Sequence, residues 1–231
     1  MLVTTFTFLL LFDFIPDFAK YETLAERKEN FIEYVLPKME AVNEDLLQQR
    51  ERLESLHKTY QIEKNLYYRD KVWVLGTAER YGIKKPSIED PELWNNLFLR
   101  VDYIPVSLII AQAAIESGWG TSRFAQLGNN LFGHRCYIEG CGIVPKERKE
   151  GLIHEVETYS SIRKSIEAYV YNMNSNEAYK NFREVRNSFR ESKTLSLDLA
   201  ETLDNYSELG EEYAKIIKNV ILHDNLQKFD R

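Results

Sequence analysis

Apolar residues recur at helical spacing along most of the chain, beginning with a segment over about residues 21–56 that is dense in Glu, Lys, Arg and Gln. Pro37 lacks a backbone N–H, so we expect the first helix to end or kink there and a second helix to span about 41–55. A third helix is predicted over about 65–81, with Gly82 as its stop. The apolar positions of the first segment are Phe31, Tyr34, Val35, Met39, Val42, Leu46 and Leu53.

The pattern continues after a loop at 84–91, which contains two prolines. Trp94 and Leu97 begin a short helix. The next helix is predicted to start near Pro105 and to end at Gly118, with a buried stripe along one face. That stripe comprises Val106, Ile109, Ile110 and Ala113. Helical stripes return from residue 161 to about residue 229.

The pattern changes between residues 128 and 160, where five glycines interrupt the sequence. Two short apolar runs, Gly142–Val144 and Leu152–Val156, flank the turn signal at 149–151. This arrangement predicts a β-hairpin. The fold class expected is therefore α+β and predominantly α: a helical domain with a small β-hairpin lobe and a helical extension before it.

Charge and composition bear on which partners and which location the protein can have. The formal net charge is −6, and the basic residues are spread among acidic ones, so no nucleic-acid partner is expected. Met1–Phe12 is almost entirely apolar or Thr but too short to span a bilayer. It is similar to the apolar core of an export signal or anchor, although a basic start is missing; a terminus packed on the domain is the alternative.

The two cysteines, Cys136 and Cys141, have four residues between them and belong to a glycine-rich loop. The spacing favours a small disulfide, which would imply an oxidising compartment. Free thiols, or a metal half-site with His134 or His154, are the alternatives. Zinc needs four ligands and the chain has no second cysteine pair, so we predict no metal.

Glu116 combines three features that favour a protonated carboxyl group. It follows Ala113 by three residues and Ile109 by seven, so it points to the apolar face of its helix. It lies in the last helical turn, where the helix dipole disfavours negative charge, and Trp119 is close. These effects raise the pKa, as a general acid requires near neutral pH. A buried Glu paired with Arg123 is the alternative interpretation.

The stretch Ala111–Ser122, which reads AQAAIESGWGTS, is followed by Gly128–Gly133, which reads GNNLFG. Together these two elements resemble the glucosaminidase family of peptidoglycan hydrolases, which has a lysozyme-like fold. Further matches at 157–160, at 174–179 and near the C-terminus extend the resemblance over about residues 92–229. It implies a catalytic domain over 92–231, an extension over 15–91, and a signal or anchor remnant over 1–14. Features of the N-terminal part, around the two cysteines and in the hairpin resemble the Bax-like subgroup of this family.

The resemblance assigns roles to individual residues. Glu116 would be the general acid, and Tyr179 would lie near the reacting sugar. Trp119, Asn130, Phe132 and Gly133 would shape the floor and walls of the sugar cleft. The alternative for Tyr179 is a core residue on an amphipathic helix.

The sequence offers two candidates for the second catalytic carboxylate. Glu147, in the strand before the hairpin turn, occupies the position that the resemblance favours, and Glu155 is its rival. Strand alternation places Glu155 and Glu157 on one face and His154 on the other. An exposed structural role for either glutamate, or replacement by the N-acetyl group of the substrate, are the alternatives.

The implied function is that of an endo-β-N-acetylglucosaminidase that cleaves peptidoglycan glycan strands with water and without a cofactor. We expect a monomer in the bacterial envelope, either periplasmic or membrane-associated through its N-terminus. The alternatives are a muramidase or lytic transglycosylase on the same fold, and a non-catalytic glycan-binding envelope protein.

Overall fold

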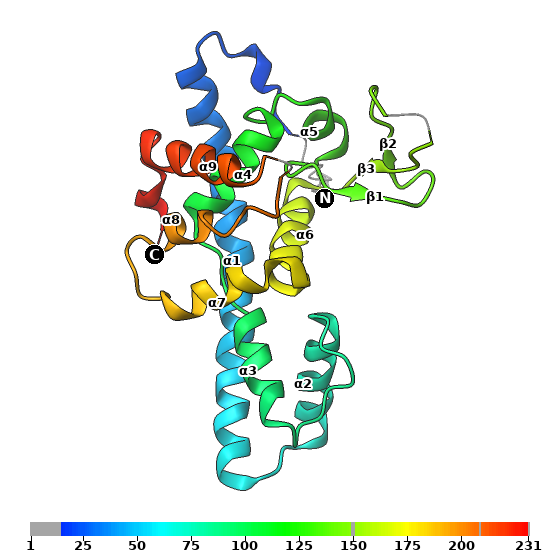
Figure 1. The fold of residues 1–231 in the computed structure, drawn as a ribbon, viewed down its shortest axis with the longest axis vertical. Coiled ribbons are helices and arrows are strands. Elements are labelled where there is room, and N and C mark those ends of the chain that lie inside the picture. Colours follow the sequence, from blue (N-terminus) through cyan, green and yellow to red (C-terminus); the bar gives the residue numbers. More distant parts are fainter. Residues whose placement is uncertain (1–14, 149–150, 208, 231) are drawn as a thin grey trace, which may run out of the picture.

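The computed structural model describes residues 15–148, 151–207 and 209–230. It is predominantly helical with a small antiparallel sheet, which confirms the predicted α+β class (Figure 1). The α-helices are α1 (Leu24–Glu63), α2 (Tyr68–Arg80), α3 (Pro91–Arg100), α4 (Val106–Ser117), α5 (Arg123–Gly128), α6 (Ile162–Ser175), α7 (Lys180–Ser188), α8 (Leu195–Ala200) and α9 (Glu211–His223). The 3₁₀ turns are η1 (Phe18–Lys20), η2 (Glu177–Tyr179) and η3 (Leu226–Phe229), and the strands are β1 (Arg135–Cys136), β2 (Gly142–Ile143) and β3 (Glu155–Glu157).

Helix α1 runs the length of the molecule as one continuous element, so the predicted break at Pro37 is wrong (Figure 1). A proline inside a helix costs about 3 kcal/mol. Pro37 lies on the exposed side of α1, and Glu33, whose carbonyl loses its partner, is exposed too. Val35 and Met39 on the opposite side are fully buried, and burying each contributes roughly 1.5–3 kcal/mol. Packing on both sides of Pro37 therefore outweighs its local cost.

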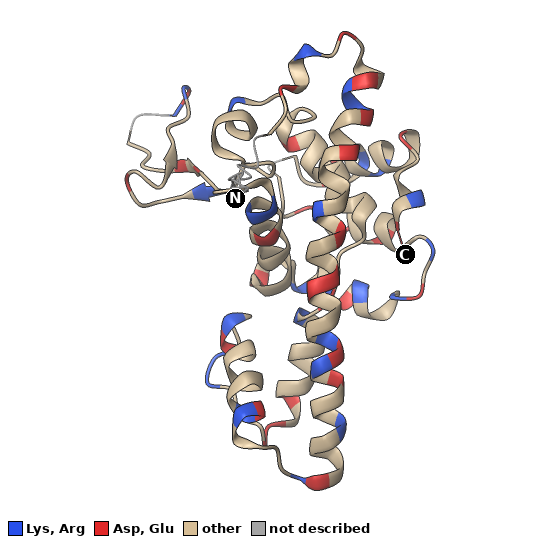
Figure 2. Ribbon diagram, turned by 180° about the vertical axis from the view of Figure 1, so that it is seen from behind, with Lys and Arg blue, Asp and Glu red and all other residues tan. Residues whose placement is uncertain are grey.

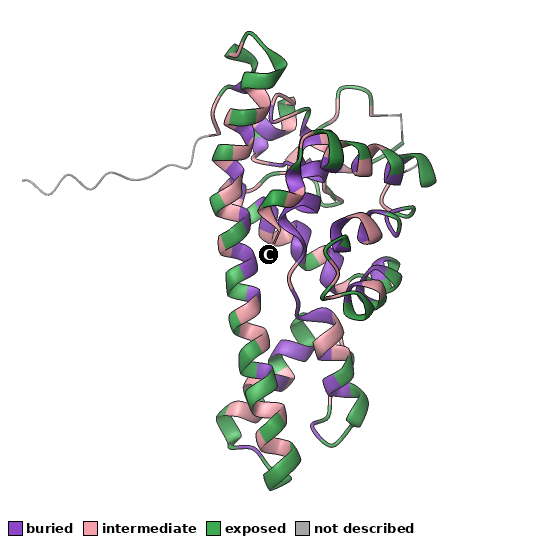
Figure 3. Cartoon of the chain, turned by 90° about the vertical axis from the view of Figure 1, so that its left-hand side faces the viewer, coloured by how far each residue is buried: buried purple, intermediate pink, exposed green. Residues whose placement is uncertain are grey.

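Buried residues form a stripe along α1 that faces the helical body (Figure 3). The upper part of α1 packs against α4 and α6, and the lower part lies beside α2 and α3. The predicted extension and the predicted catalytic region thus share one hydrophobic core. Acidic and basic residues are interspersed along the helices (Figure 2).

Helix α4 lies at the centre of this core, and its residues Leu108–Ala111 are fully buried. It contacts α1, α8, α9 and η3. Gly118 adopts a left-handed conformation with φ of 58° and ends α4 as the sequence predicts. The end of this central helix is therefore fixed within one residue of Glu116.

The β lobe is a three-stranded sheet with the order β1-β3-β2, and both pairings are antiparallel. Strands β2 and β3 form the predicted hairpin; the turn signal at residues 149–150 lies outside the described residues. Strand β1 was not predicted, because two residues are too short for an alternation pattern to be visible. The prediction of a strand from Leu152 is also wrong, since β3 begins only at Glu155.

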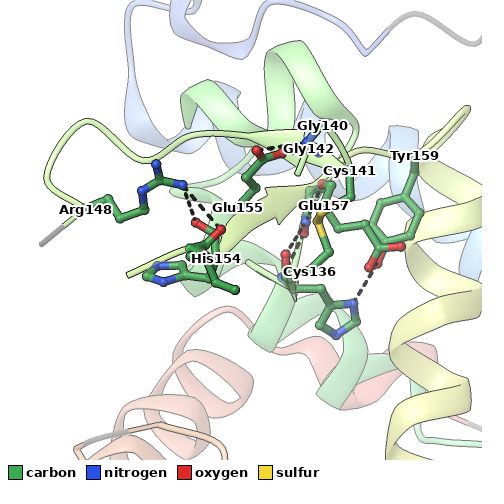
Figure 4. The surroundings of a disulfide bond; sticks show 12 residues. Cys136, Gly140, Cys141, Gly142, Arg148, His154, Glu155, Glu157 and Tyr159 are labelled. Atoms are coloured by element: carbon green, nitrogen blue, oxygen red, sulfur yellow. Dashed lines mark hydrogen bonds between the residues drawn. A yellow bond between two sulfur atoms is a disulfide. The ribbon is translucent and has the colours of Figure 1, made fainter. Parts of the chain in front are cut away.

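The structure confirms the disulfide between Cys136 and Cys141. The bond connects β1 to the residue before β2, so it links the two outer strands across β3 (Figure 4). The predicted signal or anchor at residues 1–14 lies outside the described residues. Among the helices described, none is long and apolar enough to cross a membrane.

Candidate active site

A cleft of about 930 Å³ lies between the β lobe and the helical body. Side chains from four parts of the fold line it: the end of α4, the β lobe, α6 with η2, and the connection between α8 and α9. The lining residues include Glu116, Phe132–Arg135, Tyr137, Glu157, Tyr159, Ala168, Tyr171, Asn172, Tyr179, Tyr206, Ser207 and Leu209. The cleft therefore combines one partly buried acid with several phenol and carboxylate groups.

Glu116 is the acid at the α4 end of the cleft. Burial raises the pKa of its carboxyl group, and a hydrogen bond from Tyr213 partly opposes this shift. The Tyr213 hydroxyl donates to Glu116 Oε1 at 2.8 Å. The predicted rise in pKa is thus supported. The alternative partner Arg123 instead donates to the carbonyl of Val144 at 3.2 Å.

A buried hydrogen-bond chain holds Tyr213 in place. The Tyr169 hydroxyl donates to Gln112 Oε1, and Gln112 Nε2 donates to the Tyr213 oxygen at 3.3 Å. Tyr213 must then direct its single hydroxyl proton to Glu116. The chain thus fixes the orientation of Glu116 Oε1, through residues that the sequence did not single out.

The second oxygen of Glu116 lies beside the cleft wall at Gly133. A Cβ placed on Gly133 would lie 3.8 Å from Glu116 Oε2, and Gly133 has a φ of +67° that favours glycine. Since Tyr213 occupies Oε1, a proton carried by Glu116 can reside on Oε2, on the side of the cleft. This arrangement suits donation to a bound ligand.

Tyr179 lines the cleft as expected and belongs to a group of aromatic rings. Tyr206 stacks on Tyr213 with ring centroids 5.3 Å apart, and Tyr179 lies 6.2 Å from Tyr206. Burial raises the pKa of Tyr179, and the charge of Glu116 adds to this shift. Tyr179 is therefore a neutral hydroxyl in the electrostatic neighbourhood of Glu116.

Among the β-lobe residues that the structure describes, the carboxylate that lines the cleft belongs to Glu157. The Tyr159 hydroxyl donates to Glu157 Oε2 at 3.0 Å (Figure 4). The Tyr159 oxygen also lies 3.1 Å from His134 Nδ1. Because Tyr159 has a single proton, His134 must be the donor in that contact. Burial lowers the pKa of His134 to about 4, which keeps the imidazole neutral.

Glu155, the predicted rival, does not line the cleft. It is 5% exposed, and its carboxylate accepts the backbone N–H groups of Gly140 at 3.1 Å and Gly142 at 2.8 Å (Figure 4). These two hydrogen bonds lower the pKa of Glu155. Both of its oxygens are used to fasten the disulfide loop. Glu155 and Glu157 belong to the same strand, but their carboxylates make different contacts, because the loop backbone binds the first of them.

Glu147 lies in an exposed turn after β2 and not in a strand, which corrects the predicted position. It is not among the residues that line the cleft. Its suggested role in catalysis stays a prediction.

Two of the predicted cleft residues lie behind the wall. Asn130 is buried; its amide donates to the carbonyls of His134 and Glu157, and its oxygen accepts from the backbone of Phe132 and His134. Trp119 packs edge-on against Phe31 of α1, with ring centroids 5.7 Å apart, and does not line the cleft. Phe132 and Gly133 line the cleft as expected.

One cluster of potential metal ligands occurs in the part of the chain that the structure describes, and it comprises Cys136, Cys141 and Glu155. Its sulfur atoms are joined in the disulfide, and its carboxylate accepts two backbone hydrogen bonds. His134 and His154 are not part of it. This chemistry does not suit a metal site.

Comparison with known proteins agrees with this geometry. Residues 92–226 match the glucosaminidase family model, described as mannosyl-glycoprotein endo-β-N-acetylglucosaminidase. The chain is 34% identical over 201 residues to protein bax of Escherichia coli K12. The aligned region covers 86% of this chain and 70% of that protein. No solved structure matches the chain. The chain therefore belongs to the glucosaminidase family, in its Bax-like group, and this membership indicates a glycosidase with a role related to the cell envelope.

Proposed function

We propose that this protein is an endo-β-N-acetylglucosaminidase that cleaves peptidoglycan glycan strands, with Glu116 as the general acid. The observation that carries the proposal is the placement of Glu116: a partly buried carboxyl group with a raised pKa, at the wall of a cleft between the helical body and the β lobe. A glycosidase needs such a group to protonate the leaving oxygen near neutral pH. The envelope, on its periplasmic side, is the compartment where this substrate occurs and where the disulfide would persist.

The chemistry divides between the two sides of the cleft. Glu116 donates a proton from Oε2 to the glycosidic oxygen while Tyr213 holds Oε1. Tyr179, neutral and close to Glu116, donates a hydrogen bond to the sugar at the bond that breaks. In one route a β-lobe carboxylate activates the water that attacks the anomeric carbon. In the other, the N-acetyl oxygen of the substrate attacks that carbon first, and water then hydrolyses the intermediate.

Glu157 is the carboxylate that we propose for that second role. It lines the cleft with Glu116, and Tyr159 orients it. Glu147 and Glu155 lack one or both of these features. Glu157→Gln is expected to reduce kcat at least tenfold, whereas Glu147→Gln leaves it nearly unchanged. An unchanged kcat in Glu157→Gln would leave the substrate N-acetyl group as the nucleophile, and a large loss in Glu147→Gln would restore the position that the family resemblance favours.

The cleaved bond is tested by product analysis. Purified peptidoglycan is digested, and the new ends are reduced with borohydride and identified by mass spectrometry. Reduced glucosamine ends are expected. Reduced muramic acid ends would instead indicate a muramidase, anhydro ends a lytic transglycosylase, and the absence of new ends a glycan-binding protein without hydrolase activity.

A further inference from the structure

The loop closed by the disulfide carries an aromatic residue whose position the catalytic chemistry does not explain. Tyr137 follows Cys136 directly and is 66% exposed, yet it lines the same cleft as Glu116. Its neighbour Ile138 is 78% exposed and does not line the cleft. Single exposed apolar residues are common and need no function, so exposure alone indicates nothing. Two further features argue for a function of Tyr137: its position at the cleft and the way its loop is held.

The loop backbone is fixed at several points. The disulfide joins its two ends, and the Glu155 carboxylate accepts hydrogen bonds from Gly140 and Gly142 (Figure 4). Within the loop, the N–H of Cys141 donates to the carbonyl of Ile138 at 3.1 Å. These contacts hold the segment from residue 136 to residue 142 in one conformation.

The pairing of the strands fixes the loop relative to the cleft. Cys136 pairs with Glu155 across β1 and β3, and Gly142 pairs with Glu157 across β2 and β3. A Cβ on Gly142 would lie 2.0 Å from the Val156 carbonyl oxygen, so only glycine allows this approach. The loop is therefore joined at both ends to the strand that presents Glu157 to the cleft.

A fixed, exposed aromatic ring at a cleft suits a ligand with both apolar and polar surfaces. A pyranose ring has C–H groups on its faces and hydroxyl groups around its edge, and a tyrosine offers an apolar ring with a polar tip. The polar side chains for the sugar edges are present in the same cleft: Asn172 on α6 and Ser207 between α8 and α9. Because the loop is ordered before binding, stacking on Tyr137 costs little conformational entropy.

We propose that Tyr137 is a sugar-stacking residue that binds a ring of the glycan strand next to the cleaved bond, and that the disulfide and Glu155 hold it in place. This inference rests on the proposed function for the identity of the ligand. It adds a binding subsite on the β lobe, and Tyr137 contributes to affinity and not to the chemical step.

The test measures binding in the Glu116→Gln background, where the ligand is not cleaved. Chitopentaose is titrated by calorimetry. Replacing Tyr137 by Ala is expected to weaken binding about tenfold, the value of one favourable aromatic contact of about 1.4 kcal/mol. Tyr137→Trp keeps a stacking surface and should bind within about twofold of the parent. Ile138→Ala, on the same loop but away from the cleft, is the matched control and should leave binding unchanged.

A second variant tests the role of the loop. Replacing both Cys136 and Cys141 by Ser should weaken binding toward the level of Tyr137→Ala. Adding Tyr137→Ala to that variant should then cost little more, because the two changes act through one contact. Thermal unfolding of each variant separates this effect from a loss of fold.

The results distinguish the inference from the proposed function. Equal affinity of the parent and Tyr137→Ala would overturn the stacking role, whatever the activity of the enzyme. Loss of binding in Tyr137→Ala would support the stacking role even if the wild-type chain cleaves no peptidoglycan, which would overturn only the hydrolase proposal. If the parent itself binds no chitopentaose, the sugar assignment fails.

Discussion

The end of α4 carries a partly buried glutamate and the central strand of the β lobe carries a buried one, and burial and hydrogen bonds shift their pKa values in opposite directions. Glu155 is 5% exposed, and yet two backbone N–H groups lower its pKa. Glu116 receives a single phenol hydrogen bond, and burial raises its pKa. Burial is therefore the dominant influence on the pKa of Glu116, whereas two backbone N–H donors are the dominant influence on the pKa of Glu155.

The two environments also differ in what they stabilise. Glu155 fastens a loop, so its charge contributes to the stability of the β lobe. Glu116 carries an unfavourable charge in the folded state and is available for chemistry, which is typical of a functional site.

Glu116→Gln keeps the shape of the side chain and removes its proton. The rate of peptidoglycan cleavage should fall by about 10²–10⁴-fold, because general acid catalysis typically contributes that factor. Release of reducing ends from purified peptidoglycan measures it. Glu155→Gln, which alters only the loop, should lose far less activity; equal losses in both variants would remove the distinction between them.

Gly142→Ala tests how tightly the β lobe is built. The added Cβ would lie 2.0 Å from the Val156 carbonyl oxygen, so the lobe must distort. We expect a loss of about 1–3 kcal/mol in the free energy of unfolding, measured by denaturant titration. Gly76→Ala in α2 is the control. A Cβ there meets nothing within 4 Å, and the change should stabilise the helix by up to about 1 kcal/mol.

Tyr213→Phe tests what limits the pKa of Glu116. The hydrogen bond from Tyr213 favours the charged carboxylate, so its loss raises the pKa of Glu116 further. The acid form then persists to higher pH, and the alkaline limb of the kcat profile should move to higher pH. Tyr206→Phe removes a hydroxyl that donates to the Phe132 carbonyl, and it should leave that limb in place. A shift to lower pH in Tyr213→Phe would contradict the assignment.

At pH 7, the change in stability relative to wild type should have opposite signs in Glu155→Gln and Glu116→Gln. Because the pKa of Glu155 is lowered in the fold, its charge stabilises the protein above the ordinary value of 4.5, and this contribution is lost as pH falls. Glu155→Gln should therefore be less stable than wild type at pH 7 and approach it in acid. Because the pKa of Glu116 is raised, Glu116→Gln should be more stable than wild type at pH 7, and the difference should vanish below pH 4.5. Thermal unfolding from pH 3 to pH 7 checks both signs.

Much of the helical fold follows from local sequence. The apolar stripe of α4 and the stop at Gly118 place Glu116 in the last helical turn, facing the core. The spacing of Cys136 and Cys141 indicated their bond. Pro37 shows the limit of such reasoning, because its cost is local while the burial of Val35 and Met39 depends on helices distant in sequence.

The candidate site was predictable only in part. The side chain of Glu116 and its apolar surroundings could be inferred, but its hydrogen-bond partner Tyr213 lies 97 residues further along the chain. The spacing of apolar residues within a helix does not show that two residues so far apart in the sequence are in contact. The structure of the β lobe was harder to predict from the sequence than the site around Glu116. Strands β1 and β2 have two residues each, and their pairing with β3 depends on non-local contacts.

The amino-acid pattern alone predicts most of the helices and the position of Glu116 at the end of a buried helix, and it favours the disulfide, because each of these depends on residues that are close together in the chain. Only the folded structure shows which β-lobe carboxylate lines the cleft together with Glu116. Glu155 and Glu157 share one strand, but the backbone of Gly140 and Gly142 binds the first, and Tyr159 turns the second toward the cleft. Folding brings these hydrogen-bond donors next to the two carboxylates. The order of residues along the chain does not show which donors will lie there.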